Sequence, residues 1–224
     1  MMTWTRVDFL TALHEGCEGR IELRALPSEA RIFLAPGDAD GVARFASLRA
    51  AENVYLAVAT RKDSTNGRLE NCLHLGAVFA DLDFKMTPEP AARERLARFA
   101  LPPSAVVHSG GGLHPYWFLR EPMTLPDEAA GARSLLRRLA HALEGDLMAA
   151  EPARVLRLPD TSNQKYQPSR RVTIESLDPE RRYNPSDFDE LLPPEPRANG
   201  HGAPFTMPEA LLAEGQGRNN TLSD

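Results

Sequence analysis

The sequence predicts a mixed α/β (α+β) fold in which helices and antiparallel strands share one substantial core. Segments with helical spacing of apolar residues alternate with short strand-like segments from the N-terminal region to about residue 175. Short connections rich in proline, glycine and polar residues separate neighbouring strands, which is typical of hairpins. The chain has 224 residues, of which 42% are hydrophobic. It is therefore long enough for one large domain, or for one domain with an appendage.

The N-terminal part is expected to form a small α/β lobe. Residues 6–14 have the pattern of a short amphipathic helix. Residues 20–26 and 31–34 are expected to be the strands of a hairpin that turns at Pro27 and Ser28, and residues 40–51 a second helix.

Strands dominate the middle of the chain. Residues 53–60 and 76–84 are expected to be strands on either side of a polar loop. Residues 104–108 and 114–119 are expected to pair as a hairpin around three consecutive glycines. The remaining expected elements are helices at 89–99 and 127–143 and a late strand at 171–175.

Composition restricts the setting and the partners. Two cysteines, Cys17 and Cys72, are too few for a zinc knuckle or a disulfide framework, so we expect a reducing, cytoplasmic protein. No apolar run approaches the ~20 residues that span a bilayer, and the N-terminus lacks a signal-peptide pattern. We therefore expect no membrane partner. A net charge of -5 argues against a general polyanion binder, so any nucleic-acid contact must be local.

The composition changes after Leu192. Residues 193–206 are rich in proline and glycine without periodicity and are expected to be a linker. Residues 207–224 are expected to begin a helical domain that the chain does not complete. On this interpretation residues 1–192 form the domain that carries the chemistry.

Two aspartates one residue apart, Asp81 and Asp83, lie at the end of the strand expected at 76–84. Alternation along a strand places both on one face together with Phe79. The other face is apolar and consists of Val78, Ala80, Leu82 and Phe84. Two like charges so close together require compensation, and Mg²⁺ or Mn²⁺ bound by carboxylate oxygens would provide it. A lone Asp-x-Asp remains a weak motif.

A glycine loop, Ser109, Gly110, Gly111, Gly112, Leu113 and His114, follows about thirty residues later. Consecutive glycines can adopt positive φ and let backbone N–H groups converge on an anion, and Ser109 and His114 add side-chain donors. The loop is neither a P-loop nor a dinucleotide fingerprint, because it lacks Gly-Lys-Ser/Thr and precedes a strand. The alternatives are a wide hairpin turn and a buried structural histidine.

A third feature combines acids with a basic run. Asp146 and Glu151 are followed by Arg154 and Arg157, and then by Lys165 in a polar turn. The local positive charge comes from Arg154, Arg157, Lys165, Arg170 and Arg171, against Glu151 and Asp160. The segment could supply a further metal ligand and several contacts to a triphosphate. A solvated basic face is the plainer interpretation.

In this order the three motifs resemble those of the archaeo-eukaryotic primase superfamily, in particular the primase-polymerases of phages, plasmids and other mobile elements. The similarity covers about residues 53–174. It implies an RRM-like antiparallel catalytic sheet joined to the N-terminal α/β lobe. It also implies a nucleotidyltransferase that adds nucleotides from NTPs or dNTPs to a 3′-hydroxyl on a single-stranded DNA template during replication.

The resemblance further implies residue roles. Asp81, Asp83 and Asp146 would hold two Mg²⁺ or Mn²⁺ ions, with Asp146 preferred to Glu151 on the family's spacing. The residues implied to bind the nucleotide are Ser109, Gly110, Gly111, Gly112 and His114, with Arg154, Arg157 and Lys165 on the triphosphate and Tyr116 near the sugar. The sequence departs from the family pattern at Asp160, where many relatives have glycine, and has no residues for a zinc knuckle.

The implied partners are a DNA template and primer, nucleoside triphosphates, and a C-terminal helical or helicase-like domain. Two other functions remain open. A non-catalytic RRM-like nucleic-acid-binding protein would stack bases on exposed aromatic residues, whereas this strand presents aspartates. A metal-dependent nuclease or phosphodiesterase also uses clustered carboxylates, but would not require the glycine loop or the Arg-x-x-Arg run.

Overall fold

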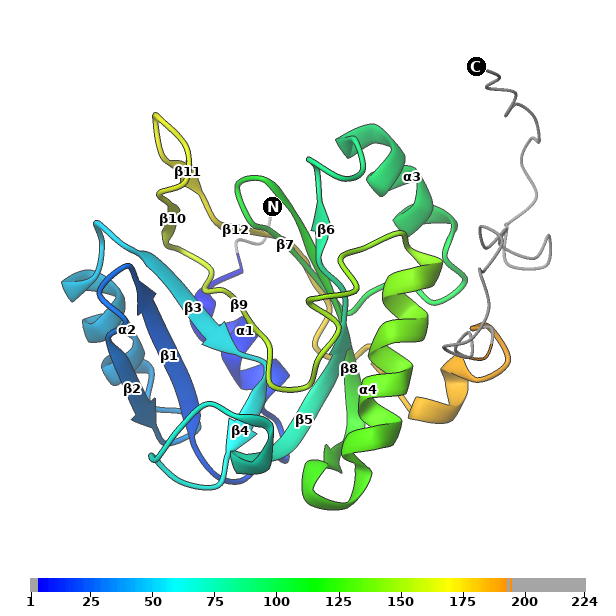
Figure 1. Cartoon of the computed structure of the whole chain (residues 1–224), viewed down its shortest axis with the longest axis horizontal. Helices are drawn as coiled ribbons and strands as arrows, with labels where there is room; N and C mark the ends of the chain where they lie inside the picture. Colours follow the sequence, from blue (N-terminus) through cyan, green and yellow to red (C-terminus); the bar gives the residue numbers. More distant parts are fainter. Residues whose placement is uncertain (1–3, 193, 195–224) are drawn as a thin grey trace.

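The structure, a computed structural model, describes residues 4–192 and 194. Two sheets form the framework (Figure 1). The small sheet has the order β2-β1-β3-β9, and its strands are β1 Ile21–Leu26, β2 Arg31–Leu34, β3 Asn53–Ala57 and β9 Val155–Arg157. The large sheet has the order β12-β7-β8-β5-β4, and its strands are β4 Ala59–Arg61, β5 Cys72–Phe79, β7 Ala105–His108, β8 Gly112–Thr124 and β12 Thr173–Leu177. Two short strands, β6 Leu82–Asp83 and β13 Arg182–Tyr183, also pair with β8. The predicted α/β class is confirmed.

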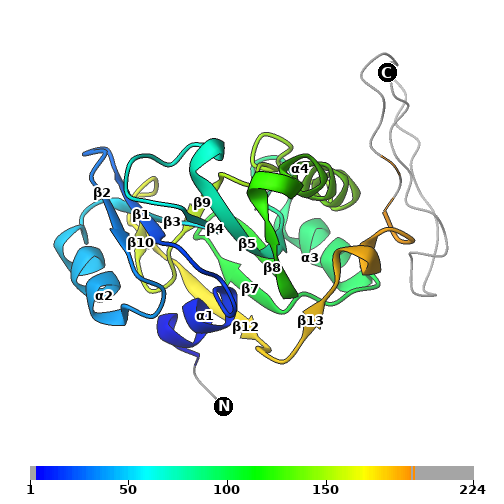
Figure 2. The ribbon, with the colours of Figure 1, turned by 90° about the horizontal axis from the view of Figure 1, so that it is seen from below.

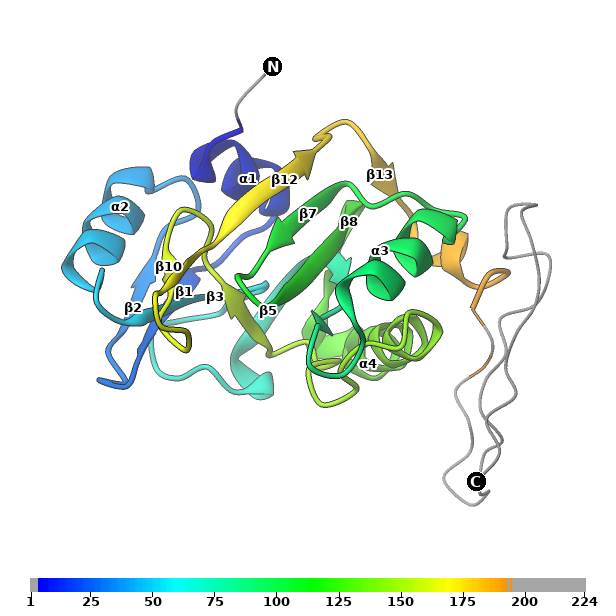
Figure 3. The ribbon, with the colours of Figure 1, turned by 90° about the horizontal axis from the view of Figure 1, so that it is seen from above.

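The small sheet and its helix lie at one end of the molecule, and α3, Glu89–Arg98, and α4, Leu125–Ala142, lie at the other (Figures 1 and 3). The predicted hairpin is present, with β1 and β2 antiparallel. Helix α2, Ala39–Leu48, begins where Asp38 accepts a hydrogen bond from the Gly41 N–H, a typical N-cap. Helix α1, Arg6–Leu13, begins with a reciprocal capping box between Thr5 and Asp8.

The large sheet is covered on both faces. Figure 2 shows α1 on one side of it and α4, Leu125–Ala142, on the other. The ring of Phe9 in α1 lies 5.1 Å from that of Tyr116, whereas the neighbouring Trp117 packs 5.6 Å from Phe99 after α3, Glu89–Arg98. Val78 and Phe79 are consequently both fully buried. The half-buried strand expected from alternation was therefore wrong for this part of β5.

Two predicted strands are divided in the structure. The segment 53–60 supplies β3 to the small sheet and β4 to the large sheet, because the chain crosses between the sheets at Val58. The segment 76–84 is interrupted after Phe79, and only Leu82 and Asp83 pair again, as β6. This interruption places Asp81 outside regular pairing, at the edge that faces the small sheet.

A buried ion pair joins the sheets. Arg61 of β4 donates from Nε to Glu22 of β1 at 2.8 Å, and both side chains are inaccessible to solvent. A second guanidinium nitrogen of Arg61 donates to the carbonyl of Ala153 at 3.3 Å. The pair therefore fixes the chain immediately before Arg154.

The remaining predicted elements are confirmed with shifted ends, namely the hairpin β7–β8, the helices α3 and α4, and β12. Six of the described elements were not predicted, namely η1 Leu69–Asn71, β9, β10 Ser162–Asn163, β11 Arg170–Arg171, β13 and η2 Pro185–Phe188. Apart from Pro194, the expected linker 193–206 and the helical segment 207–224 lie outside the described residues. Within residues 4–192, no helix is long and apolar enough to cross a membrane.

Candidate functional site

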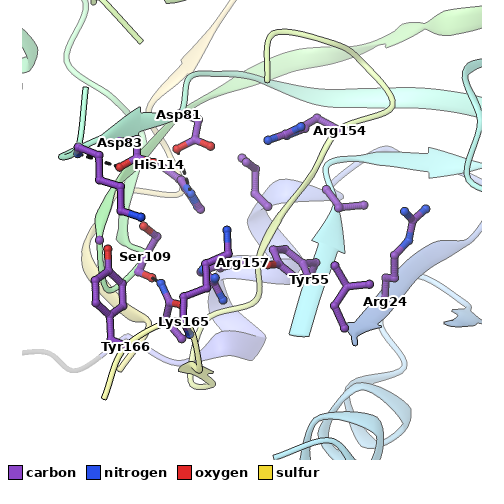
Figure 4. A pocket seen from close by; sticks show the side chains of 16 residues that line it. Arg24, Tyr55, Asp81, Asp83, Ser109, His114, Arg154, Arg157, Lys165 and Tyr166 are labelled. Atoms are coloured by element: carbon purple, nitrogen blue, oxygen red, sulfur yellow. Dashed lines mark hydrogen bonds and ion pairs between the residues drawn. The ribbon is translucent and has the colours of Figure 1, made fainter. Parts of the chain in front are cut away.

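A pocket of about 270 Å³ lies between the two sheets (Figure 4). It brings together residues that are far apart in the sequence. From the large sheet and its loops come Asp81, Asp83, Lys85, Ser109, Gly111 and His114. The small sheet and the segments on either side of β9 contribute Arg24, Leu26, Tyr55, Arg154, Val155, Leu156, Arg157, Asn163, Lys165 and Tyr166.

The two aspartates lie at one edge of the pocket, close to His114 (Figure 4). Asp83 belongs to β6, which pairs with Gly112, and its Oδ1 accepts a hydrogen bond from the Lys85 N–H at 2.9 Å. The Asp81 carboxylate lies 3.5 Å from Nε2 of His114. Both aspartates line the pocket as the alternation predicted, although the strand carrying them is broken.

Asp81 is in an environment that favours its charged form. Burial acts to raise the pKa of this carboxyl group, but His114, Arg154 and Arg157 outweigh it, and the pKa lies below its ordinary value. Protein cations therefore already compensate the charge on the acidic edge, a role that the sequence argument assigned to a metal alone.

His114 is buried and held by strand pairing opposite Val107. Its Nε2 faces Asp81, and its Nδ1 has no hydrogen-bond partner among the described residues. A buried ring nitrogen without a partner is costly. Within the described part of the chain, the buried core residue His14 also has an unpartnered ring nitrogen, so it is the contact of Nε2 with Asp81 that connects His114 with the pocket.

The glycine loop is packed more tightly than expected. The Ser109 N–H donates to the Gly112 carbonyl at 2.9 Å, and the Gly110 N–H to Nδ1 of His108 at 3.1 Å. These N–H groups cannot converge on an anion, so that part of the expectation was wrong. Ser109 and Gly111 line the pocket, whereas Gly110 and Gly112 do not.

Close packing explains the glycines better than anion binding does. Gly110 has φ +83°, and a Cβ at Gly111 would lie 2.2 Å from the hydroxyl oxygen of Tyr166. At Gly112 a Cβ would lie 2.4 Å from the Leu82 carbonyl oxygen. The loop is thus held between β6 and the segment that carries Tyr166, and it positions Ser109 and His114.

The two candidate third acids differ in position. The Asp146 N–H donates to the Asp81 carbonyl at 2.8 Å, and the Asp146 carboxylate lies 4.0 Å from Arg154. Glu151 instead pairs with Arg133 of α4 at 2.8 Å. The geometry therefore favours Asp146, although its side chain does not line the pocket.

Metal ligands are present only in part. Within residues 4–192, no three His, Cys, Asp or Glu side chains gather closely enough to hold a metal ion. Mg²⁺ commonly keeps several waters and is held by one or two carboxylates together with substrate phosphates. Asp81 and Asp83 fit that pattern, whereas an all-protein cage of three acids is not formed.

The opposite wall is basic and rigid. Arg157 is buried, donates to Oδ1 of Asn53 at 2.8 Å and lies with its guanidinium carbon 5.1 Å from the centre of the Tyr55 ring. Burial lowers the pKa of Arg157, and Tyr55 and Asp81 act against that shift. Five cationic residues line the pocket, Arg24, Lys85, Arg154, Arg157 and Lys165, against two aspartates. The pocket thus carries an excess of positive charge suited to a polyphosphate.

Sequence reasoning missed several lining residues, namely Arg24, Tyr55, Lys85, Asn163 and Tyr166. Arg24 and Tyr55 are direct neighbours across β1 and β3, and Tyr55 is the neighbour of Arg157 across β3 and β9. The alternation of side chains along β1 and β3 was the only sequence signal for this row. It could not indicate which face of the small sheet would lie opposite the aspartates.

The expected position of Tyr116, near the sugar, has to be corrected. It follows His114 by two residues on β8, but its ring is buried against Phe9 and does not line the pocket. Burial raises the pKa of its hydroxyl beyond the ordinary range, and the charge of Asp81 adds to this shift. The packing of α1 over this part of β8 turns an expected site residue into a core residue.

No family model matches the sequence, and no curated protein does. Solved structures do match. The AEP domain of the primase-polymerase of cyanophage S-2L is 19% identical, with a TM-score of 0.59 over 83% of this chain and 95% of that one. The primase RepB′ is 14% identical, with a TM-score of 0.53 over 79% of this chain and 58% of that one. Its catalytic domain in complex with initiator DNA is 16% identical, with a TM-score of 0.51 over 79% of this chain and 87% of that one. The chain therefore has the fold of archaeo-eukaryotic primase catalytic domains.

Proposed function

We propose that this chain is the catalytic domain of a primase-polymerase, which adds nucleotides from NTPs or dNTPs to a 3′-hydroxyl on a single-stranded DNA template. One observation carries the proposal. In a primase fold, two aspartates on one sheet face a set of fixed cations on another across a pocket of about 270 Å³.

The acidic edge provides the place for metal ions. Asp81 and Asp83 would hold Mg²⁺ or Mn²⁺, with Asp146 as a further ligand or as a support for the backbone at Asp81. When bound, such ions stabilise the attacking and leaving oxygens of an in-line displacement at phosphorus. The depressed pKa of Asp81 keeps that carboxylate charged at neutral pH, as a ligand must be.

The cationic residues would hold the triphosphate. Arg157 is fixed by Asn53 and Tyr55, so little side-chain freedom is lost when it contacts a phosphate. Lys165, Ser109 and His114 line the same pocket and would add further contacts. A charge-assisted hydrogen bond of this kind contributes about 1.5 to 3 kcal/mol.

The same wall also has a less polar part that suits the nucleoside. Leu26, Tyr55, Val155 and Leu156 line the pocket on the small-sheet side. Phosphates directed toward Asp81 and Lys165 would leave the sugar and base against these residues. This orientation places the α-phosphate nearest the aspartates, where transfer must occur.

Neither alternative explains the pocket as well. A nuclease needs carboxylates but no preformed set of five cations for a triphosphate. A binding module of the RRM type would present aromatic rings on an open sheet, whereas both faces of this large sheet are covered. The catalytic domain of RepB′, described in complex with initiator DNA, supports DNA as the template. The cyanophage enzyme supports a role in the replication of a phage or mobile element.

The test is nucleotide incorporation by the purified chain. It would be incubated with single-stranded DNA, labelled nucleotides and Mg²⁺ or Mn²⁺, with and without an annealed primer. We expect metal-dependent extension of the primer, and its loss when Asp81 and Asp83 are both replaced by Asn. Degradation of the DNA without extension would instead identify a nuclease, and binding without either reaction would identify a binding module.

A further inference from the structure

The basic run 154–171 separates into two groups in the structure. Arg154, Arg157 and Lys165 line the pocket, whereas Arg170 and Arg171 form β11. The hairpin β10–β11, residues 162–171, projects from the body of the molecule (Figure 1). From residue 161 to residue 174 the sequence contains Lys165, Arg170 and Arg171 and no acidic residue. The nucleotide pocket therefore leaves part of this positive charge unexplained.

The hairpin is held in place on the glycine loop. The Arg170 guanidinium donates to the Gly110 carbonyl at 3.1 Å and lies 3.8 Å from the centre of the Tyr166 ring. On the other strand, Asn163 donates from Nδ2 to the Ser109 carbonyl at 2.9 Å. These contacts fix a basic projection at the rim of the pocket.

Arg171 faces away from this anchor. Successive side chains of a strand point to opposite sides, and Arg171 is exposed and does not line the pocket. Among the residues that the structure describes, none forms a hydrogen bond or ion pair with its side chain. Arg6 lies nearby and donates to the carbonyls of Pro159 and Asp160 at 2.8 and 3.0 Å.

The electrostatics of this outer face agree with its exposure. Burial lowers the pKa of Arg6, Asp160 raises it, and the charge of Arg171 lowers it again. Two guanidinium groups are thus close enough to repel each other, and one carboxylate compensates them only in part. Such an arrangement favours an external anion.

We propose that the outer face of the hairpin β10–β11 docks the phosphate backbone of the single strand that is copied, with Arg171 as its main contact. The inference rests on the proposed function and specifies which surface of this chain the copied DNA strand contacts. A nucleotide held in the pocket is on the other side of the hairpin. An extended polyanion that crosses the rim can reach Arg171 while its bases approach the pocket.

Arg171→Gln tests this surface, and Arg120→Gln is the matched control. Arg120 is also an exposed arginine, but it lies on β8 eight residues beyond Gly112, roughly 26 Å along the strand. Binding of fluorescent oligo(dT) and oligo(U) of about 20 nucleotides would be measured by anisotropy over a range of KCl. Loss of one phosphate contact lowers the slope of log K against log [salt] by about 0.7, or roughly fivefold in affinity at about 0.1 M KCl.

We expect that loss for Arg171→Gln on both oligonucleotides, no loss for Arg120→Gln, and recovery with Arg171→Lys. Four outcomes would each overturn the proposal. They are an equal loss of affinity in the two Gln variants, an unchanged affinity of Arg171→Gln, a loss confined to one oligonucleotide, and no binding by the wild-type chain. Primer extension separates the two proposals. A chain that binds through Arg171 but never extends a primer refutes the activity alone, and a chain that extends primers with Arg171→Gln binding normally refutes the surface alone.

Discussion

The two walls of the pocket are built in different ways. On the large sheet, Asp81, Asp83, Ser109 and His114 come from neighbouring strands and the turns between them, all within residues 81–114. On the small sheet, Arg24, Tyr55 and Arg157 form a row across three strands, two of which are about a hundred residues apart in the chain. The first wall can be recognised as a motif, whereas the second exists only once the strands are in register.

The walls also differ in chemistry. The large-sheet wall offers two carboxylates and the His114 ring, whose Nε2 lies beside Asp81. The small-sheet wall offers cations and an aromatic ring, and Arg157 is immobilised by Asn53 and Tyr55. We therefore expect the large-sheet wall to determine the rate of nucleotide transfer and the small-sheet wall to determine nucleotide affinity.

The largest effect is expected from Asp81→Asn combined with Asp83→Asn. Removing both carboxylates should lower the rate of primer extension by at least about 10³-fold, equivalent to about 4 kcal/mol in the barrier. Nucleotide binding measured in EDTA should persist, because the cations of the other wall remain. Undiminished extension by the folded double variant would refute the assignment of the acidic edge.

A smaller effect is expected from the third acid. Asp146→Asn should lower the rate by roughly 100-fold, the upper range for residues that support metal ligands, because it removes the carboxylate that the backbone hydrogen bond to Asp81 holds next to the acidic edge. Glu151→Gln should change it little, since an exposed ion pair such as that with Arg133 contributes about 0 to 1 kcal/mol. Single-turnover extension rates would be compared. The reverse ranking would transfer the role to Glu151.

The basic wall is tested by Arg157→Ala. Loss of this fixed cation should weaken nucleotide binding by about 1.5 to 3 kcal/mol, or roughly 10- to 150-fold. The maximal rate at saturating nucleotide should fall much less. Tyr116→Phe is the matched control, because that hydroxyl is in the core and should not affect affinity. Titration calorimetry with a non-reactive nucleotide gives the affinities, and equal losses in both variants would contradict the assignment of the wall.

The smallest effect concerns stability at low pH. The pKa of Asp81 is lower in the folded chain than the ordinary value of about 3.9 expected for the unfolded chain. Its charged form therefore stabilises the fold above the unfolded pKa, and this contribution disappears as the pH falls through the folded pKa. Asp81→Asn should thus be less stable than the wild type at pH 7, with the difference vanishing in acid. Urea unfolding at pH 7 and at a pH below the folded pKa of Asp81 would give the difference in the free energy of unfolding between the two chains. A difference that grows in acid would contradict the expected direction.

Much of the large-sheet wall could be predicted from the sequence. Asp81, Asp83, Ser109 and His114 lie in short segments whose residue types and spacing are informative, and all four line the pocket. The small-sheet row could not be predicted, because the pairing of Arg24, Tyr55 and Arg157 depends on strand register over long distances. The motif predicted that Arg157 belongs to the site, but it did not predict that Tyr55 and Arg24 lie in the same row.

Two expectations were wrong for different physical reasons. The family resemblance placed Tyr116 near the sugar because it lies close to the glycine loop in the sequence, yet its ring packs against Phe9 of α1. The loop N–H groups were expected to bind an anion, yet those of Ser109 and Gly110 donate to the Gly112 carbonyl and to Nδ1 of His108. Tertiary packing thus removed the Tyr116 ring from the pocket, whereas local hydrogen bonds within the turn occupied the two loop N–H groups.

Templated incorporation tests the central claim most directly. A primer would be annealed to four templates that differ only in the first unpaired base, and each of the four nucleotides would be offered separately with Mg²⁺ or Mn²⁺. The proposed function predicts that the complementary nucleotide is added in each case and that the chain lacking the carboxylates of Asp81 and Asp83 adds none. Incorporation that ignores the template base, or that persists without those carboxylates, would contradict it.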